Sequence, residues 1–342
     1  MVLPEAEVNF DDEADNYSFP VKQTLRLKRV MGYEKHRIAR DGASSSDLCV
    51  YGLNRLINEK IIDPGEIGAI IAVTITPDYF VPHVSNIIQG RCGLQNDVLC
   101  VDISQGCAGF IIGLSHAFML LEHLGGKKVL LFNADVLSHK VSKRDRNSYP
   151  LIGDMATVTL VENSRGARDI FFNIYMDGSR GSALIIPAGG SRLPCSQLTA
   201  EMRDDGEGNF RSLDNMKMDG FEVFNFVQRE VPRMVGETLG YAGVNKEEVD
   251  WYLFHQPNKF MLQKLADSIG VPREKVFMNI VENYGNPSGA SIPAVIAHNL
   301  SEDIGREKYL CCLAAFGGGL AWGAMVMELG NFGFCETVTS NL

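Results

Sequence analysis

One stretch of the chain, residues 101–121, sets the strongest constraint on the fold. Its sequence, VDISQGCAGFIIGLSHAFMLL, begins as the end of an apolar strand, turns at Gln105-Gly106, and continues with apolar residues at helical spacing. Cys107 stands at the turn, immediately before the helix. Because strand-turn-helix units of this kind recur in α/β proteins, the stretch predicts an α/β fold with Cys107 at the end of a strand.

The position of Cys107 is suited to a nucleophile. Unpaired backbone N–H groups and the positive end of a helix dipole favour a thiolate, so we expect a thiol pKa below the ordinary value of about 8.5. The alternative is a structural cysteine, since most cysteines of this chain lie in apolar segments. The eight cysteines form no CxxC pair: Cys49, Cys92, Cys100, Cys107, Cys195, Cys311, Cys312 and Cys335. Neither a zinc site nor a disulfide framework is expected.

Composition narrows the classes of protein that remain. The 342 residues are 45% hydrophobic, enough for a large core in one domain or two similar halves. The net charge of −10 argues against a nucleic-acid partner, and an acidic protein partner would need a local basic patch such as Arg26, Lys28 and Arg29. No apolar run approaches the roughly 18 residues of a membrane span, and the acidic N-terminus differs from a signal peptide. We expect a cytoplasmic protein without membrane association.

Strands and helices alternate along most of the chain, as in a parallel or mixed sheet. We expect a helix from about Ser45–Asp47, buried strands at 65–77 and 127–136, and a helix at about 84–92.

The chain is also expected to consist of two similar halves. Both parts have the order strand, active loop, buried helix, from which we infer a duplication, although no repeat is legible residue by residue. The N-terminal half comprises residues 1–165 and contains Cys107. The C-terminal half comprises residues 166–342 and includes the loop-rich part 166–220.

Three further motifs of the second half contain candidate functional residues. His255 closes the apolar strand 249–257, at the strand end where α/β folds build their sites, although a lone histidine is more often structural. Asn286 lies in the turn NYGNPSGASIP, where a simple turn residue is the alternative. Gly317–Gly319 form either a hairpin turn or a place where backbone N–H groups approach a ligand. With Cys107, these features supply what acyl transfer through a thioester needs.

Taken in this order, the residues resemble the thiolase superfamily and, within it, the ketoacyl-acyl-carrier-protein synthase III enzymes. The matching motifs are GCAGF at 106–110, FHQPN at 254–258, YGNPSGASIP at 284–293 and AFGGGLAWG at 315–323, with weaker similarity at 32–39 and 218–226. Asn286 distinguishes the chain from hydroxymethylglutaryl synthases, which have a glutamate in the catalytic trio.

The resemblance implies a five-layered αβαβα fold and a homodimer. Cys107 takes an acyl group from a thioester, and the amides of Cys107 and Gly318 form an oxyanion hole. His255 and Asn286 then stabilise the enolate formed when a malonyl unit on acyl carrier protein loses carbon dioxide. No metal or bound cofactor is implied; coenzyme A and carrier-protein thioesters are substrates.

Substrate-binding residues follow from the same resemblance, with departures. Arg146 matches an arginine that contacts the adenine of coenzyme A, whereas Arg26 stands near the place of the family's tryptophan, which puts acyl-CoA in question as primer donor. Tyr79 and Phe80 fall in the acyl-pocket loop that reaches across the dimer. Lys259 becomes the expected contact for carrier protein, with Lys264, because Phe260 replaces the usual arginine.

Two other functions and one structural departure stay open at this point. The chain could serve as a non-decarboxylating acyltransferase of specialised metabolism, or as a non-catalytic partner of a condensing enzyme. The family also begins with a strand before the segment that matches LPEAEVNF, so we expect that strand to be missing or supplied otherwise.

Overall fold

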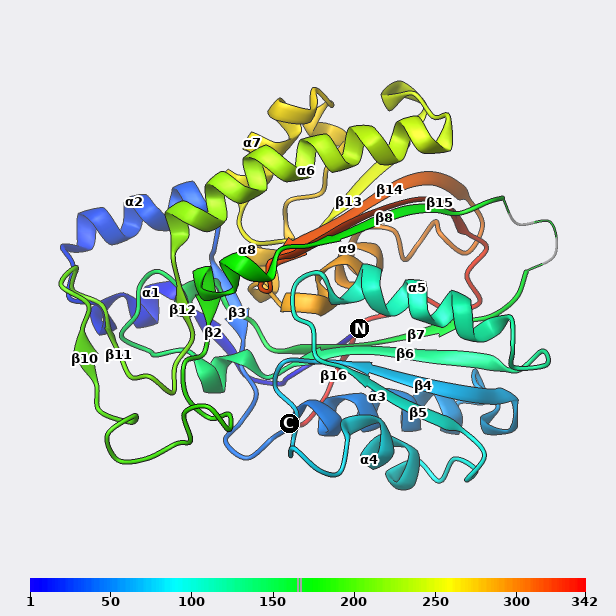
Figure 1. Cartoon of the computed structure of the whole chain (residues 1–342), viewed down its shortest axis with the longest axis horizontal. Coiled ribbons are helices and arrows are strands. Elements are labelled where there is room, and N and C mark those ends of the chain that lie inside the picture. Colours follow the sequence, from blue (N-terminus) through cyan, green and yellow to red (C-terminus); the bar gives the residue numbers. More distant parts are fainter. Residues whose placement is uncertain (165, 167) are drawn as a thin grey trace.

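Two sheets, separated and covered by helices, form the molecule (Figure 1). The computed structural model describes residues 1–164, 166 and 168–342. The first sheet has the strand order β16-β1-β7-β6-β4-β5. Its strands are β1 (Val2–Leu3), β4 (Ile67–Val73), β5 (Leu99–Ile103), β6 (Lys128–Asp135), β7 (Met155–Val161) and β16 (Val338–Thr339).

The short strand β1, at the start of the segment where the family's first strand was expected to be missing or supplied otherwise, lies beside β7. Val2 pairs with Ala156 of β7 in antiparallel fashion, and β1 pairs in parallel with β16 on its other side. The strand is therefore supplied by two residues at the start of the chain, supported by a segment from its end.

The second sheet has the order β13-β14-β15-β8, with strands β8 (Phe171–Met176), β13 (Trp251–Phe254), β14 (Lys308–Gly317) and β15 (Ala321–Gly330). Its directions repeat those of the first sheet. In the second sheet, β13 is parallel to β14, and the strands β14, β15 and β8 follow one another in antiparallel pairs. In the first sheet, β4 is likewise parallel to β6, and the strands β6, β7 and β1 follow in antiparallel pairs. We propose that the chain comprises two halves of one topology. Residue 165, the expected boundary, lies outside the described residues.

Helices form three further layers, which gives the five-layered αβαβα fold that the sequence predicted. The outer face of the first sheet is covered by α3 (Ser45–Asn58) and α4 (Val84–Arg91), and that of the second by α6 (Gly220–Ala242) and α7 (Lys259–Ile269). Between the sheets lie α5 (Gly109–Leu121) and α9 (Ser291–Asn299) (Figure 1).

Strand β4 shows why the sequence folds in this way. All seven of its residues are buried, and successive side chains point to opposite faces. Ile70 and Ala72 join the core under α3 and α4, whereas Ile71 and Val73 join the core around α5. The unbroken apolar sequence of β4 is therefore explained by its position between two layers of helix.

The remaining elements lie at the end of the sheets where β5, β6 and β13 finish. α1 (Phe10–Glu13), α2 (Val21–Met31) and α8 (Ile280–Tyr284) are helices, and three short ladders pair β2 with β3, β9 with β12 and β10 with β11. The strands of these ladders are β2 (Glu7–Asn9), β3 (Lys35–Arg37), β9 (Leu184–Ile185), β10 (Arg203–Asp204), β11 (Phe210–Arg211) and β12 (Lys217–Met218). Within the described residues, no helix has both the length and the apolar character to cross a membrane.

Candidate active site

Cys107 lies in the turn between β5 and α5, as the sequence predicted. The turn is closed by a hydrogen bond from the Gly109 amide to the carbonyl of Gly106, at 2.7 Å. Two glycines allow the turn to be this tightly packed. A Cβ atom on Gly109 would lie 2.5 Å from Cγ1 of Val73, and one on Gly317 would lie 2.4 Å from Cβ of Cys107. The second sheet therefore contacts the nucleophile directly through β14.

The thiol itself differs from the sequence-based prediction. Its pKa is raised to about 11, chiefly because burial disfavours the thiolate and because the carboxyl of Asp135 adds negative charge nearby. The Ser288 hydroxyl and the backbone amides of Cys107 and Gly318 lie near the sulfur and oppose this shift. The helix N-terminus was thus correctly located, but the expectation of a lowered pKa is wrong. Cys107 rests as a neutral thiol.

His255 directly follows β13 and is held in a neutral state. Its backbone amide donates to the carbonyl of Ala314 at 2.8 Å, and its ring meets that of Phe316 edge-on. The side chain is 2% exposed, and burial lowers the pKa of the imidazole to about 3. Nδ1 lies 2.7 Å from Oγ of Ser291, the first residue of α9. When Ser291 donates this hydrogen bond, the ring proton lies on Nε2.

Asn286 sits between α8 and α9 in a turn that is fixed at its backbone. Its amide donates to the carbonyl of Leu151 and its carbonyl accepts from the amide of Gly153. Gly285 has a φ of +81°, a conformation that favours glycine, which explains the glycine before Asn286. The side-chain Oδ1 of Asn286 accepts from the Ser288 amide at 2.9 Å. Within the described part of the chain, Nδ2 has no partner and is left to donate.

Ser288 is the residue that brings the three candidates together. It is buried and has a φ of +51°, in the left-handed region, so a β-branched or bulky residue would be strained at this position. Its backbone contacts His255 and Asn286, and its hydroxyl faces the Cys107 thiol and Asp135. Sequence reasoning missed Ser288 and Ser291, although both lie in the motif that contains Asn286. Their signal was the unusual density of serine and glycine there.

Asp135 is a second residue that the sequence did not single out. It ends β6 with its side chain fully buried, and its Oδ1 accepts hydrogen bonds from the Thr74 hydroxyl, the Ile75 amide and the Thr76 hydroxyl at 2.8–3.1 Å. Burial nevertheless raises the pKa of Asp135 to about 6. The available signal was an apolar strand that ends in a carboxylate, in the same sheet as the strand leading to Cys107 and separated from it by β4.

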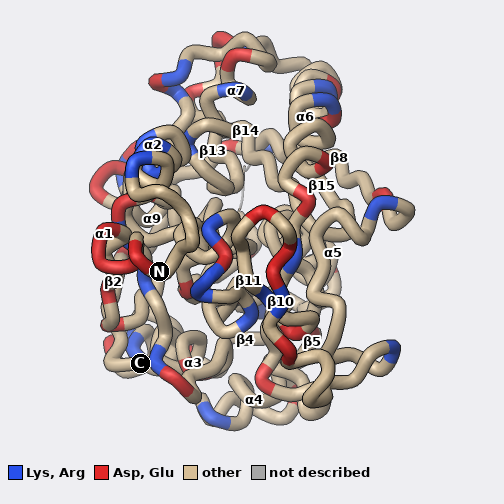
Figure 2. Tube along the Cα trace, turned by 90° about the vertical axis from the view of Figure 1, so that its left-hand side faces the viewer, with Lys and Arg blue, Asp and Glu red and all other residues tan. Residues whose placement is uncertain are grey.

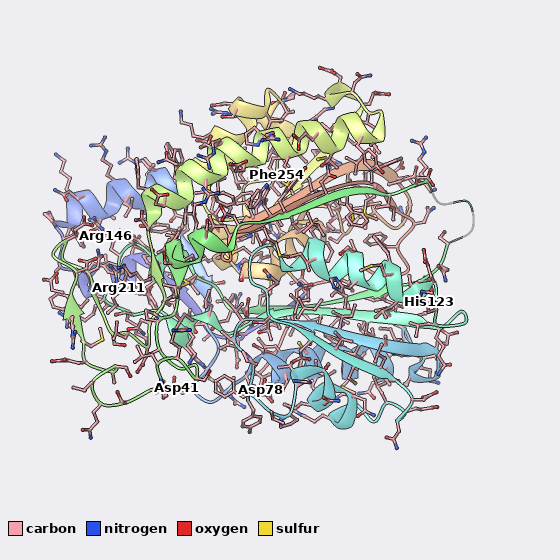
Figure 3. All side chains as sticks on the ribbon, viewed as in Figure 1. Asp41, Asp78, His123, Arg146, Arg211 and Phe254 are labelled. Carbon is pink, nitrogen blue, oxygen red and sulfur yellow. The ribbon has the colours of Figure 1, made fainter. Side chains whose placement is uncertain are left out.

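Arg146 packs against the loop that precedes α2. Its guanidinium lies 3.2 Å from the centre of the Phe19 ring, and its backbone amide donates to the side chain of Asn209. One face of the guanidinium is therefore covered by an aromatic ring of the same chain. Figure 3 shows Arg146 with Arg211 at the end of the molecule where α1 and α2 lie.

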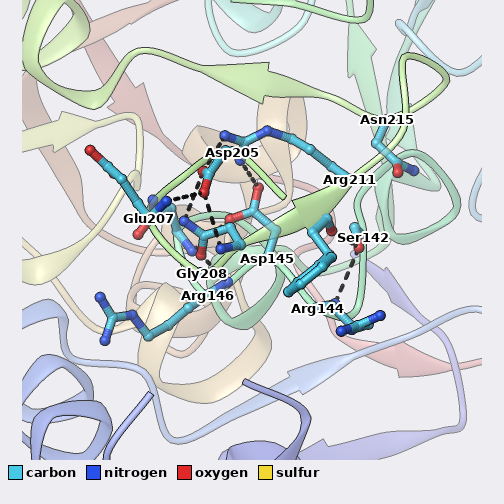
Figure 4. Close-up of polar contacts among 12 residues, drawn as sticks. Ser142, Arg144, Asp145, Arg146, Asp205, Glu207, Gly208, Arg211 and Asn215 are labelled. Atoms are coloured by element: carbon cyan, nitrogen blue, oxygen red, sulfur yellow. Dashed lines mark hydrogen bonds and ion pairs between the residues drawn. The ribbon is translucent and has the colours of Figure 1, made fainter. Parts of the chain in front are cut away.

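The segment around Arg146 is held by the β10–β11 hairpin (Figure 4). Arg211 bridges the carboxylates of Asp145 and Asp205, with both N–O distances at 2.6 Å. Arg144 stacks on Phe210 from the same hairpin. Because Asp145 is buried, this charge needs its partner, so the hairpin and the 144–146 segment form one unit.

The other expected substrate contacts lie at the surface. Tyr79 and Phe80 are 63% and 79% exposed in the loop between β4 and α4. Lys259 opens α7 and packs against Gly32, the cap residue of α2, where a Cβ atom would lie 2.6 Å from that of Lys259. Neither position contradicts the expected roles, which stay predictions.

Known proteins match over nearly the whole chain. The family model described as 3-oxoacyl-[acyl-carrier-protein (ACP)] synthase III matches residues 101–178, and the model of its C-terminal part matches residues 239–329. The beta-ketoacyl-[acyl-carrier-protein] synthase III of Lactococcus lactis strain IL1403 is 33% identical over 300 residues, which cover 86% of this chain and 88% of that protein. This chain belongs to the 3-oxoacyl-[acyl-carrier-protein] synthase III family of the thiolase superfamily.

Solved structures of 3-oxoacyl-(acyl-carrier-protein) synthases agree with this assignment. A 3-oxoacyl-(acyl-carrier protein) synthase from Burkholderia xenovorans LB400 has a TM-score of 0.91 and 31% identity, over 99% of this chain and 95% of that one. The synthase III of Aquifex aeolicus VF5 has a TM-score of 0.78 and 29% identity, over 96% and 97%. The expected enzyme class, a condensing acyltransferase, is confirmed, as is the thiolase-like fold.

Proposed function

We propose that this synthase III carries an acyl group on Cys107 and joins it to a malonyl unit held by acyl carrier protein, with loss of carbon dioxide. The observation that carries this proposal is the convergence of Cys107, His255 and Asn286 on Ser288. A nucleophile that also leaves well and two neutral hydrogen-bond donors are the groups that such a condensation needs.

The first half-reaction exchanges one thioester for another. The Cys107 sulfur attacks the acyl carbonyl, the carrier thiol departs, and the proton of Cys107 ends on that thiol. The amides of Cys107 and Gly318, which face the sulfur, are placed to stabilise the oxyanion that forms. Each such donor is typically worth about 3–4 kcal/mol of barrier. The raised thiol pKa does not oppose the net reaction, because thiol is consumed and thiol is released.

The second half-reaction develops negative charge on the malonyl thioester. The carboxylate leaves as carbon dioxide, and the electron pair forms an enolate whose oxygen accepts from Nε2 of His255 and Nδ2 of Asn286. The enolate carbon then attacks the acyl group on Cys107, and the released thiolate takes up a proton. A histidine with a pKa near 3 stays neutral throughout, so it donates a hydrogen bond without competing for a proton.

Carrier protein is proposed to dock over α2 and α7. Lys22, Arg26 and Arg29 are exposed on α2, and Figure 2 shows basic residues along this helix. Lys259 of α7 lies directly beside the end of α2. In a chain of net charge −10, this is a local basic surface that fits an acidic carrier protein.

The exposed Tyr79 and Phe80 support a homodimer in which this loop enters the partner's acyl pocket. Large apolar side chains that are mostly exposed on one chain are typical of an interface. The Phe19 ring on Arg146 also bears on the primer donor. Phe19 covers one face of the guanidinium, and the other face stays available to stack on the adenine of coenzyme A.

Intact-protein mass spectrometry tests the function. The enzyme is incubated with a panel of acyl-coenzyme A and acyl-carrier-protein thioesters, and then with malonyl-carrier protein. We expect one acyl adduct on the wild-type protein and on Cys195→Ala, none on Cys107→Ala, and discharge of the adduct with release of carbon dioxide. An adduct that malonyl-carrier protein leaves in place would indicate the non-decarboxylating acyltransferase. No adduct from any thioester would indicate the non-catalytic partner.

A further inference from the structure

A buried acid–base pair outside the catalytic trio joins the N-terminal segment to the active-site end of the sheets. His36 of β3 is 2% exposed and Glu13 of α1 is 8% exposed. Nε2 of His36 lies 2.9 Å from Oε2 of Glu13, and Nδ1 lies 2.6 Å from the backbone carbonyl of Ile152. None of the steps proposed above uses either side chain.

The two contacts of the His36 ring determine where the protons of this pair lie. A carbonyl oxygen can only accept, so Nδ1 of His36 carries a proton and donates it to Ile152. The short contact with Glu13 contains one further proton, on either the imidazole or the carboxyl group. In both cases the pair as a whole is neutral, which a buried site requires. Glu13 therefore orients the imidazole, and the imidazole holds the carbonyl of Ile152.

Ile152 belongs to the segment that holds the backbone of Asn286. The residue before it, Leu151, accepts from the Asn286 amide at 2.5 Å, and the residue after it, Gly153, donates to the Asn286 carbonyl at 3.1 Å. The two segments are so close that a Cβ atom on Gly153 would lie 1.9 Å from the carbonyl oxygen of Tyr284. We therefore expect a displacement of Ile152 to displace Asn286 as well.

Two further contacts connect the Glu13–His36 pair with the backbone around Asn286. β3, which carries His36, packs against α8, which leads into Asn286. The ring of Tyr149 meets the imidazole edge-on at 5.5 Å and opens the short 3-10 helix Tyr149–Leu151. By contrast, Cys107 is held by Gly317, and His255 is held by Ser291 and Ala314.

We propose that Glu13 and His36 are a positioning pair for Asn286. The pair touches neither substrate nor the reacting atoms, and acts by fixing the carbonyl of Ile152. This inference rests on the proposed function, in which Asn286 serves the second half-reaction but not the acylation of Cys107. Loss of the pair therefore impairs decarboxylation and condensation selectively. An enzyme that had merely become less stable would lose both half-reactions together.

The test measures both half-reactions in His36→Ala. We expect acylation of Cys107 within about twofold of wild type, and condensation with malonyl-carrier protein lowered by about 10²-fold, the cost typical of a misplacement near 1 Å. The double variant His36→Asn with Glu13→Gln restores an amide donor near the place of Nδ1 and leaves no buried charge. It is expected to recover about tenfold of the lost condensation rate. Glu7→Gln is the matched control, since Glu7 pairs with Lys35 and Arg37 on the same strand at the surface.

Equal losses in both half-reactions of His36→Ala, or no loss in either, would overturn the proposal. So would a double variant that condenses no faster than His36→Ala. Hydrogen exchange gives a readout that does not depend on the reaction. We expect faster exchange of the Gly153 and Asn286 amides in His36→Ala but not in Glu7→Gln, with the 109–121 helix unchanged. If the wild-type enzyme acylates but does not release carbon dioxide, the proposed function fails. The exchange comparison still decides whether the pair holds Asn286, and unchanged exchange would refute it.

Discussion

Gly317 and Cys107 touch across the two sheets, with no room for a side chain between them. A Cβ atom on Gly317 would lie 2.4 Å from Cβ and 2.9 Å from Sγ of Cys107. The position of the nucleophile is thus set by β14, some two hundred residues further along the chain, as well as by its own turn.

Gly317→Ala is accordingly expected to displace the thiol. Acylation of Cys107 should fall by about 10²-fold, since a shift of the reacting atom of the order of 1 Å has this cost. The rate of adduct formation by mass spectrometry checks it. Gly236→Ala is the control, because a Cβ atom there meets nothing within 4 Å. Unchanged acylation in Gly317→Ala would contradict the packing argument.

The pH dependence of Cys107 alkylation follows from the raised thiol pKa. With a pKa of about 11, only about one thiol in 10⁴ is ionised at pH 7, so a small alkylating reagent reacts slowly. The rate should rise about tenfold per pH unit up to the limit of stability, without levelling off near pH 8.5. Site-resolved mass spectrometry measures it, with Cys195 as an exposed internal reference. A plateau below pH 8 would instead indicate the thiolate that the helix N-terminus alone would favour.

Asp135 should make stability depend on pH in an unusual direction. Its pKa is raised to about 6 from 3.8, so the folded state binds a proton that the unfolded state has lost between these values. Stability from this group is present below pH 3.8 and is lost as pH rises through 6, by up to about 3 kcal/mol. Asp135→Asn keeps an acceptor for Thr74 and Thr76 and removes the titration. The difference in unfolding free energy between wild type and variant, measured from pH 4 to 7, should therefore slope. A flat difference would refute the assignment.

Charge reversal on α2 tests the docking surface. Arg26→Glu with Arg29→Glu is expected to lower kcat/KM for malonyl-carrier protein by about tenfold, with weaker salt dependence, because like charges then face an acidic partner. Acylation of Cys107 from acyl-coenzyme A provides the comparison, and it should change much less. Arg306→Glu, an exposed reversal before β14, is the control. Equal effects of the two reversals would mean that the partner binds elsewhere.

The parts of the site that the sequence predicted are those that local patterns determine. The turn at Cys107, the strand end at His255 and the glycine-rich turns each lie within a dozen residues, where periodicity and turn chemistry are legible. The matching motifs then identified the family. The two-residue strands β1 and β16 are too short to show any period, so their pairing was not visible.

The thiol pKa shows where local reasoning ends. The helix N-terminus next to Cys107 is a local feature, and it was found correctly. The burial that outweighs it includes the contact with Gly317 of the second sheet, and the negative charge comes from Asp135 at the end of β6, two strands away from β5. In the same way, Arg146 could be matched to the family, but its stacking on Phe19 arises between two loops far apart in sequence. Such effects depend on tertiary contacts that no single segment encodes.

The pairing of β1 with β16 has a consequence for synthesis. Val2 and Leu3 lie beside Val338 and Thr339, and the amide of Val338 donates to the carbonyl of Met1. On a ribosome, β1 emerges before β16, so this edge of the sheet is complete only after Val338 and Thr339 have been made. Nascent chains stalled before Val338 should expose the backbone of Val2–Leu3, whereas released chains protect it. One strand of this edge is thus made early and its partner late, so the edge can close only late in synthesis.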